Sequence, residues 1–117
     1  MHEIGILYKM MDHAEAVARE NNVSKIERIA VEVGDLSGVL PAFLEKYYPI
    51  VIEGREILKD SGLLIQMVPG QALCDECQTL YNVMKNEGKC PRCSSRSKSI
   101  LGGRDFVVKS IICQELG

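Results

Sequence analysis

The segment CDECQTLYNVMKNEGKCPRC, residues 74–93, contains two Cys-x2-Cys pairs. A Cys-x2-Cys turn can direct both of its sulfurs at one centre, and two such turns complete a tetrahedron of thiolates. In a reducing compartment, cysteines paired in this way favour metal ligation over disulfides. The spacing therefore predicts one zinc site, and its ligands are Cys74, Cys77, Cys90 and Cys93.

Two disulfides, a redox Cys-x2-Cys pair and an iron site are the other interpretations of this segment. Iron is the strongest rival, because a Cys-Pro-x-Cys pair combined with a second Cys-x2-Cys pair also resembles the knuckles of rubredoxin. Rubredoxin encloses its iron with several aromatic side chains, whereas Tyr81 is the only aromatic residue between these pairs. A redox role would need an exposed cysteine of low pKa at a helix start, and nothing around Cys74 or Cys90 specifies one.

The residues around the cysteines are poor in large apolar side chains, so residues 70–104 cannot form a core of their own. Structural zinc contributes on the order of 10 kcal/mol to the folding of small peptides and can replace such a core. We therefore expect a zinc-ribbon-like zinc-binding domain over 70–104. A zinc ion with four thiolates has no open position for a substrate, so we expect a structural role and no enzyme activity.

Outside this segment the hydrophobic pattern predicts two helices and three strands. Apolar residues recur every three to four positions over 4–20, which indicates an amphipathic helix, and they alternate over 26–33, which indicates a strand. A second helix is expected to begin near Leu40-Pro41 and to kink or stop at Pro49, before Ile50 to Ile52. Residues 62–68 and 106–113 are the remaining strands.

The predicted fold class is α+β, with two helices on a small three-stranded sheet that is interrupted by the four-cysteine module. One domain would span 1–69 and be completed by 105–117 as its last strand, and the zinc-binding domain would span 70–104. Cys113 stands alone on the last strand, where we expect a small buried apolar residue.

The composition limits the classes of function. The chain has 117 residues, 46% of them hydrophobic, and a formal net charge of -2, so it lacks the basic excess that binds nucleic acid or anionic membranes. No apolar run approaches the roughly 20 residues of a membrane-spanning helix, and the first residues do not resemble a secretory signal. We therefore expect a cytoplasmic protein without nucleic-acid or membrane partners.

A zinc-ribbon module that binds nucleic acid or another protein is the alternative function. It is motivated by Arg92, Arg96 and Lys98, which lie among serines close to the cysteines. Such a module would bind DNA or RNA with a strong salt dependence. The acidic net charge and the scarcity of aromatic residues count against nucleic-acid binding.

The first three residues, Met1, His2 and Glu3, offer a second metal site. The amine of Met1, the backbone nitrogen of His2 and its Nδ1 atom can close two fused chelate rings around one ion. Nitrogen-rich tetragonal ligation of this kind suits Ni(II) or Cu(II). The fourth ligand could be the backbone nitrogen or carboxylate of Glu3, or a group from elsewhere. A frayed terminus is the ordinary alternative.

The initial Met-His-Glu, the helix after it, the segment VEVGDLSGV and the late Cys-x2-Cys and Cys-Pro-x-Cys pairs resemble, in this order, the HypA family of nickel-insertion accessory proteins for NiFe hydrogenase. The resemblance covers the whole chain. It implies a nickel metallochaperone that carries transient Ni(II) on His2 with the terminal amine and neighbouring backbone. It also implies structural Zn(II) on Cys74, Cys77, Cys90 and Cys93.

The resemblance also implies partners. Family members deliver nickel with a GTPase, HypB, to the hydrogenase large subunit and in some organisms to urease, so urease accessory proteins are further candidates. Some relatives carry an additional nickel-binding His in the zinc module, but this chain has no His beyond His13. Exchange of the last strand between two copies could produce a homodimer.

Overall fold

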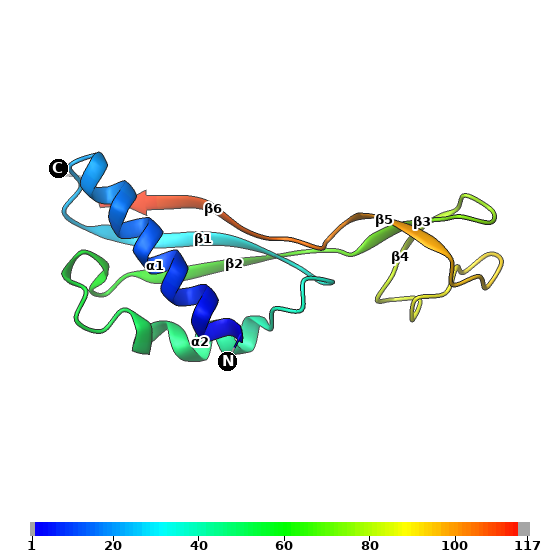
Figure 1. Cartoon of the computed structure of the whole chain (residues 1–117), viewed down its shortest axis with the longest axis horizontal. Helices are drawn as coiled ribbons and strands as arrows, with labels where there is room; N and C mark the ends of the chain where they lie inside the picture. The colour runs from blue at the N-terminus through cyan, green and yellow to red at the C-terminus, as the bar shows by residue number, and fades with distance from the viewer. Residues whose placement is uncertain (1, 115–117) are drawn as a thin grey trace. The chain divides into compact units, whose positions relative to one another are not determined.

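The computed structural model describes the backbone of residues 2–114 and the side chains of residues 3–114 (Figure 1). Met1 and residues 115–117 lie outside the described part. In chain order the elements are α1 (His2–Glu20), β1 (Ile26–Gly34), α2 (Pro41–Val51), a 3-10 turn η1 (Glu56–Leu58), β2 (Gly62–Val68), β3 (Gln71–Cys74), β4 (Leu80–Asn82), β5 (Lys98–Gly102) and β6 (Phe106–Cys113).

The first sheet has the strand order β2-β1-β6, so β1 lies in the centre. α1 packs against α2, and it buries a stripe that includes Leu7, Met11 and Ala14. Ile29 on β1 and Leu44 on α2 are also fully buried. The spacing of the buried positions on α1 is that of one helical face, as an amphipathic helix requires.

The predicted α+β class, with two helices and a three-stranded sheet, is confirmed by this arrangement. Of the two outcomes expected at Pro49, a kink or a stop, the stop was wrong, because α2 continues through Pro49 to Val51. Pro49 has no N–H to donate to the carbonyl of Glu45, four residues earlier, but Glu45 is exposed, so water can take the place of the missing donor. Within residues 2–114, no helix is long and apolar enough to cross a membrane.

A second three-stranded sheet, which the sequence pattern did not reveal, has the order β4-β3-β5. β3 is its central strand and pairs antiparallel with both neighbours, so that Ala72 lies opposite Tyr81 on β4 and Ile100 on β5. Ala72 and Tyr81 are buried together with Cys74 and Cys90. The core of this sheet is therefore built on the cysteines themselves.

The chain divides into two compact units. The first contains residues 1–31, 40–66 and 107–117, and the second contains residues 32–39 and 67–106. The second unit thus holds all four paired cysteines and the loop after β1.

Three glycines of the second unit allow the backbone to cross itself at close range. A Cβ atom on Gly34 would overlap the Gly103 carbonyl group, and one on Gly103 would lie 2.6 Å from the Gly70 Cα atom. Gly103 also has a φ of +88°, a left-handed conformation that L side chains rarely adopt. Leu36 N–H donates to the Gly103 carbonyl at 2.7 Å. We call residues 34–36, 68–70 and 103–105 the glycine junction.

Candidate metal centre

The four paired cysteines meet in the second unit. Their sulfurs all lie within 4.8 Å of one another, and the Cys74–Cys93 and Cys77–Cys90 Sγ atoms are 3.5 Å apart. Cys74 and Cys90 are buried, Cys77 is half-buried and Cys93 is exposed. Cys74 ends β3, and the other three cysteines lie in turns outside the strands.

The two Cys-x2-Cys turns, or knuckles, repeat one backbone pattern. In the first, Gln78 N–H donates to the Cys74 carbonyl at 2.9 Å, and in the second, Ser94 N–H donates to the Cys90 carbonyl at 2.8 Å. Gln78 and Ser94 both adopt positive φ, at 62° and 65°. In both knuckles the backbone therefore turns back after the second cysteine, so that each knuckle directs its two sulfurs to the same side.

Hydrogen bonds tune the pKa values of the thiols. The Thr79 side chain, 3.2 Å from Cys77 Sγ, and the Thr79 N–H lower the pKa of Cys77 to about 6. Burial opposes ionisation of Cys90, but N–H groups of Cys93 and Arg92 lower the pKa of Cys90. The Ser95 N–H favours the Cys93 thiolate, yet the Cys74 thiol, burial and the other sulfurs raise the pKa of Cys93 to about 12. Without a cation, the four thiols cannot all ionise easily, because the thiolates would repel one another at this short distance.

A zinc ion fits this donor set. Four sulfurs at about 2.3 Å from a common centre in a tetrahedron lie about 3.8 Å from one another. The observed 3.5 Å pairs and the 4.8 Å limit are compatible with that separation. N–H donors to sulfur are the surroundings that metal-bound thiolates usually have. A dication would also remove the charge repulsion, because it binds all four sulfurs as thiolates.

Three residues of the metal centre were missed by the sequence argument. Thr79 contacts the sulfur of Cys77, and Asp75 bonds two serine hydroxyls from inside the first knuckle. Tyr81 is 6% exposed. Its hydroxyl is buried and has no hydrogen-bond partner, the only such side-chain oxygen or nitrogen among the described residues. Burial and the nearby thiolates of Cys74 and Cys90 raise its pKa. Only Tyr81 had a sequence signal, as the single aromatic residue between the pairs.

The predicted nickel residues lie at the start of α1. Met1 is outside the described residues, and only the backbone of His2 is described, as the first residue of α1. Glu3 is buried at 8% exposure, and its Oε2 atom accepts a hydrogen bond from Leu40 N–H at 3.4 Å. The Glu3 carboxylate is therefore directed at the beginning of α2. Cys113, predicted to be buried, is half-buried on β6.

Two of the three basic residues that motivated the nucleic-acid alternative, Arg96 and Lys98, bond the backbone of the cysteine module. Lys98 Nζ donates to the Arg96 carbonyl at 2.7 Å, and Arg96 Nη1 donates to the Glu87 carbonyl at 3.4 Å. Both side chains thus have hydrogen-bond acceptors within the module.

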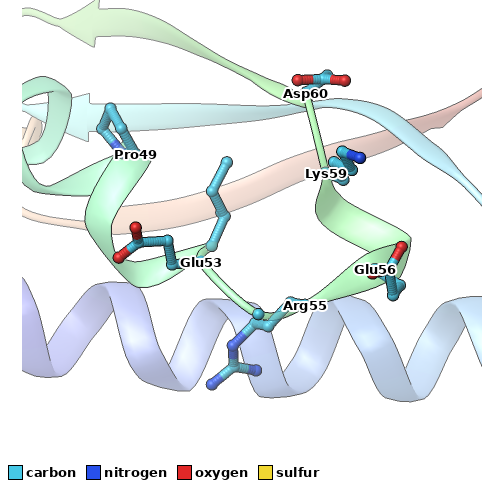
Figure 2. Close-up of a pocket in the computed structure, with 8 residues that line it drawn as sticks. Pro49, Glu53, Arg55, Glu56, Lys59 and Asp60 are labelled. Carbon is cyan, nitrogen blue, oxygen red and sulfur yellow. The ribbon is translucent and has the colours of Figure 1, made fainter.

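A pocket of about 350 Å³ lies where α2 is followed by η1 (Figure 2). Figure 2 shows Arg55 turned toward α1, and Arg55 Nη1 bonds Glu15 and lies 3.0 Å from Asp12 Oδ1. The pocket contains none of the predicted metal ligands. It is lined by Pro49, Ile52, Glu53, Gly54, Arg55, Glu56, Lys59 and Asp60.

The fold and the site together define a class: a small α+β protein with a second sheet that carries four converging cysteines able to hold a metal ion. The family model for hydrogenase/urease nickel incorporation, metallochaperone, HypA, matches residues 1–113. The chain belongs to the HypA family. The predicted resemblance is thereby confirmed, and the family is one of metallochaperones rather than enzymes.

Named relatives are similar along nearly their whole length. A hydrogenase maturation factor HypA from Chlorobium limicola is 30% identical over 115 residues, 98% of each chain. One from a Picosynechococcus species is 32% identical over 111 residues, 95% of this chain and 97% of the relative.

Solved structures support the fold. The solution structure of the nickel metallochaperone HypA from Helicobacter pylori has a TM-score of 0.66 at 22% identity, covering 95% of this chain and 96% of that one. A second HypA solution structure has a TM-score of 0.70 at 24% identity, covering 97% of both chains.

Proposed function

We propose that this chain is a cytoplasmic nickel metallochaperone that holds Ni(II) transiently at its N-terminus and releases it to a partner protein. The observation that carries the proposal is the match of residues 1–113 to a family of nickel metallochaperones. Within that family, the relatives named above are hydrogenase maturation factors. The proposed recipients are a hydrogenase large subunit, served with a HypB-type GTPase, and urease through its accessory proteins.

The proposed nickel ligands are the Met1 amine, the backbone nitrogen and Nδ1 of His2, and a contribution from Glu3. The first N–H groups of a helix have no carbonyl partner within it, so a metal that replaces the His2 or Glu3 proton breaks no helical hydrogen bond. Because the Glu3 carboxylate accepts from Leu40 N–H, the backbone nitrogen of Glu3 is its more available donor. These nitrogen donors bind nickel only when deprotonated, so acidification should release the ion.

The proposed zinc ligands are Cys74, Cys77, Cys90 and Cys93. The convergence of their sulfurs and the N–H donors around them support a structural ion that holds the second sheet together. We further propose that residues 1–69 with 105–117 form the nickel-binding domain and that residues 70–104 form the zinc-binding domain. A four-thiolate ion has no vacant position, which suits a permanent ion better than a transferable one.

Nickel titration of the zinc-loaded full chain tests the N-terminal site. The wild-type chain with a free terminus is compared with His2→Ala, with a chain extended by one residue before Met1, and with His13→Ala. His13 is the matched control, because it is the only other histidine of the chain and is exposed on α1. We expect loss of at least tenfold in nickel affinity for His2→Ala and the extended chain, and no change for His13→Ala.

Equal nickel binding by all four proteins would contradict the N-terminal chelate. Isothermal titration at several pH values provides the second measurement, because nickel affinity should fall as the imidazole and amine become protonated, at about pH 8 and below. Total metal content of the purified wild-type chain measures the other site, where one zinc per chain is expected.

A further inference from the structure

Asp75 lies inside the first knuckle and joins it to the chain that leads into β5. Its N–H donates to the Ser97 carbonyl at 3.1 Å. Its carboxylate accepts hydrogen bonds from Ser97 Oγ at 2.9 Å and from Ser99 Oγ at 2.8 Å, one on each oxygen. We call these three contacts the Asp75 clasp.

The serines of the clasp, Ser97 and Ser99, lie four and six residues after Cys93, the last residue of the second knuckle. Cys90 N–H donates to the Ser95 carbonyl at 2.9 Å, and Ser97 N–H donates to Ser95 Oγ at 3.1 Å. Ser95 thus holds the start of the second knuckle, and Ser97 continues from it to Asp75. The clasp therefore connects the two pairs of sulfurs through the polypeptide, independently of any ion between them.

The charge of Asp75 makes its position informative. Zinc with four thiolates carries two negative charges, and a carboxylate next to it is repelled. Attraction to the loaded site therefore does not explain an acidic residue between Cys74 and Cys77. The two hydroxyl donors and the backbone pairing do explain it, since an ionised carboxylate accepts from both serines at once.

We infer that Asp75 is a positioning residue that sets the spacing of the two knuckles and thereby slows the release of the metal ion. The inference rests on the proposed zinc site. Groups that orient metal ligands from outside the coordination sphere typically change metal affinity by 10-fold to 100-fold when they are removed. Because Asp75, Ser97 and Ser99 are exposed and water competes for their hydrogen bonds, the effect belongs near the lower limit, about tenfold.

The test measures the rate at which zinc leaves the full-length, zinc-loaded chain when a chromogenic chelator is in excess. Asp75→Ala should release zinc about tenfold faster than the wild type. Asp75→Asn keeps the shape and can accept from one hydroxyl while donating to the other, so it should restore most of the wild-type rate. Glu76→Ala is the matched control, because Glu76 is the adjacent exposed acid in the same knuckle, and its release rate should not change.

A double variant, Ser97→Ala with Ser99→Ala, removes the partners without altering the knuckle, so it still tests the clasp if Asp75→Ala fails to fold. It should accelerate release as much as Asp75→Ala, and combining all three changes should add little, because the residues act as one unit. The visible spectrum of the cobalt-substituted protein should change in Asp75→Ala and remain unchanged in Glu76→Ala and Asp75→Asn.

Wild-type release rates in Asp75→Ala and in the serine variant would overturn the clasp while leaving the zinc site in place. Equal acceleration by Glu76→Ala would overturn it as well, because charge alone would then be the cause. A wild-type chain that holds no zinc would overturn the four-cysteine site and the clasp with it, and that failure is visible before any variant is made.

Discussion

A single carboxylate, that of Glu3, supports the start of α2 by accepting from the N–H of the N-cap residue Leu40. Leu40 precedes α2 and has no side chain that could accept a hydrogen bond from the first N–H groups. Glu3, 37 residues earlier in the chain, instead accepts from the N–H of Leu40 itself, and its negative charge lies near the positive end of the helix dipole. The start of α1 is thus held against the start of α2.

Glu3→Ala is expected to lower the free energy of unfolding by about 1 kcal/mol, the usual net contribution of one hydrogen bond. Glu3→Gln keeps a neutral acceptor and should cost less. Urea unfolding followed by circular dichroism provides the measurement, and Glu20→Ala, at the exposed end of α1, serves as the control. An equal loss in Glu20→Ala would mean that the Leu40 contact contributes nothing of its own.

At the scale of elements, Tyr48 ties α2 to the beginning of β2. Its hydroxyl lies 2.8 Å from Ser61 Oγ and donates to the Gly62 carbonyl at 3.3 Å. Burial raises the pKa of Tyr48 above its ordinary value of about 10, although the bond with Ser61 opposes the shift. The folded chain therefore keeps this proton at pH values where the unfolded chain loses it.

Tyr48→Phe should lower stability at neutral pH by about 1 kcal/mol, because the two hydrogen bonds are lost. The stability that the raised pKa contributes is fully present below about pH 10 and declines as the pH rises through the folded-state pKa. The melting temperature of the wild type should therefore fall more steeply than that of Tyr48→Phe as the pH rises above about 10. Parallel curves for the two proteins would contradict the assigned burial of the phenol.

Arg55 ties α1 to the segment after α2. Its guanidinium bonds both Glu15 and Asp12, and the side chains of Arg55 and Glu15 are only 23% and 16% exposed. Arg55→Met would leave Glu15 without its less exposed partner and should cost about 1–2 kcal/mol. Arg19 offers a matched control, since it bonds the same carboxylate but is 71% exposed, so Arg19→Met should cost less than about 0.5 kcal/mol.

Thermal unfolding at low and high salt measures both arginine variants. The loss in Arg55→Met should persist in about 0.5 M NaCl, because partly buried pairs are screened less than exposed ones. Similar small losses in both variants would show that Glu15 is adequately solvated without Arg55.

At the scale of the whole molecule, the two units depend on different sources of stability. The first buries apolar side chains of α1, α2 and β1, whereas the core of the second consists largely of Ala72, Tyr81 and the buried cysteines. We therefore expect metal ligation to replace apolar area in the second unit.

Removal of zinc by a chelator should unfold residues 70–104 and leave the helical signal of α1 and α2 largely intact. Limited proteolysis followed by mass spectrometry provides the measurement, with new cleavage sites expected between Cys74 and Cys93. Cys90→Ser should behave like the chelated protein, whereas Cys113→Ser, a change in the unpaired cysteine, should not. Simultaneous loss of the helical signal would show that the two units unfold together.

The hydrophobic pattern of the sequence predicted the helices and strands whose apolar residues recur at one regular spacing. The strands over 62–68 and 106–113 have the bounds expected from the sequence, and the cysteine spacing identified the four sulfurs that converge. The sheet of β3, β4 and β5 was not predicted, because its strands are short and its core residues are cysteines. Long-range contacts, such as Glu3 with Leu40 and Asp75 with Ser97, leave no trace in local periodicity.

The glycine junction brings the two ends of the cysteine segment into direct backbone contact at Gly70 and Gly103. When the first and last residues of a segment are in contact, a loop within the segment can change length without moving those ends. Doubling the length of a flexible loop costs only about 0.6 kcal/mol. The exposed turn between β4 and the second knuckle, residues 84–89, is the part of this segment that can gain or lose residues, whereas the crossing point has no room for a side chain.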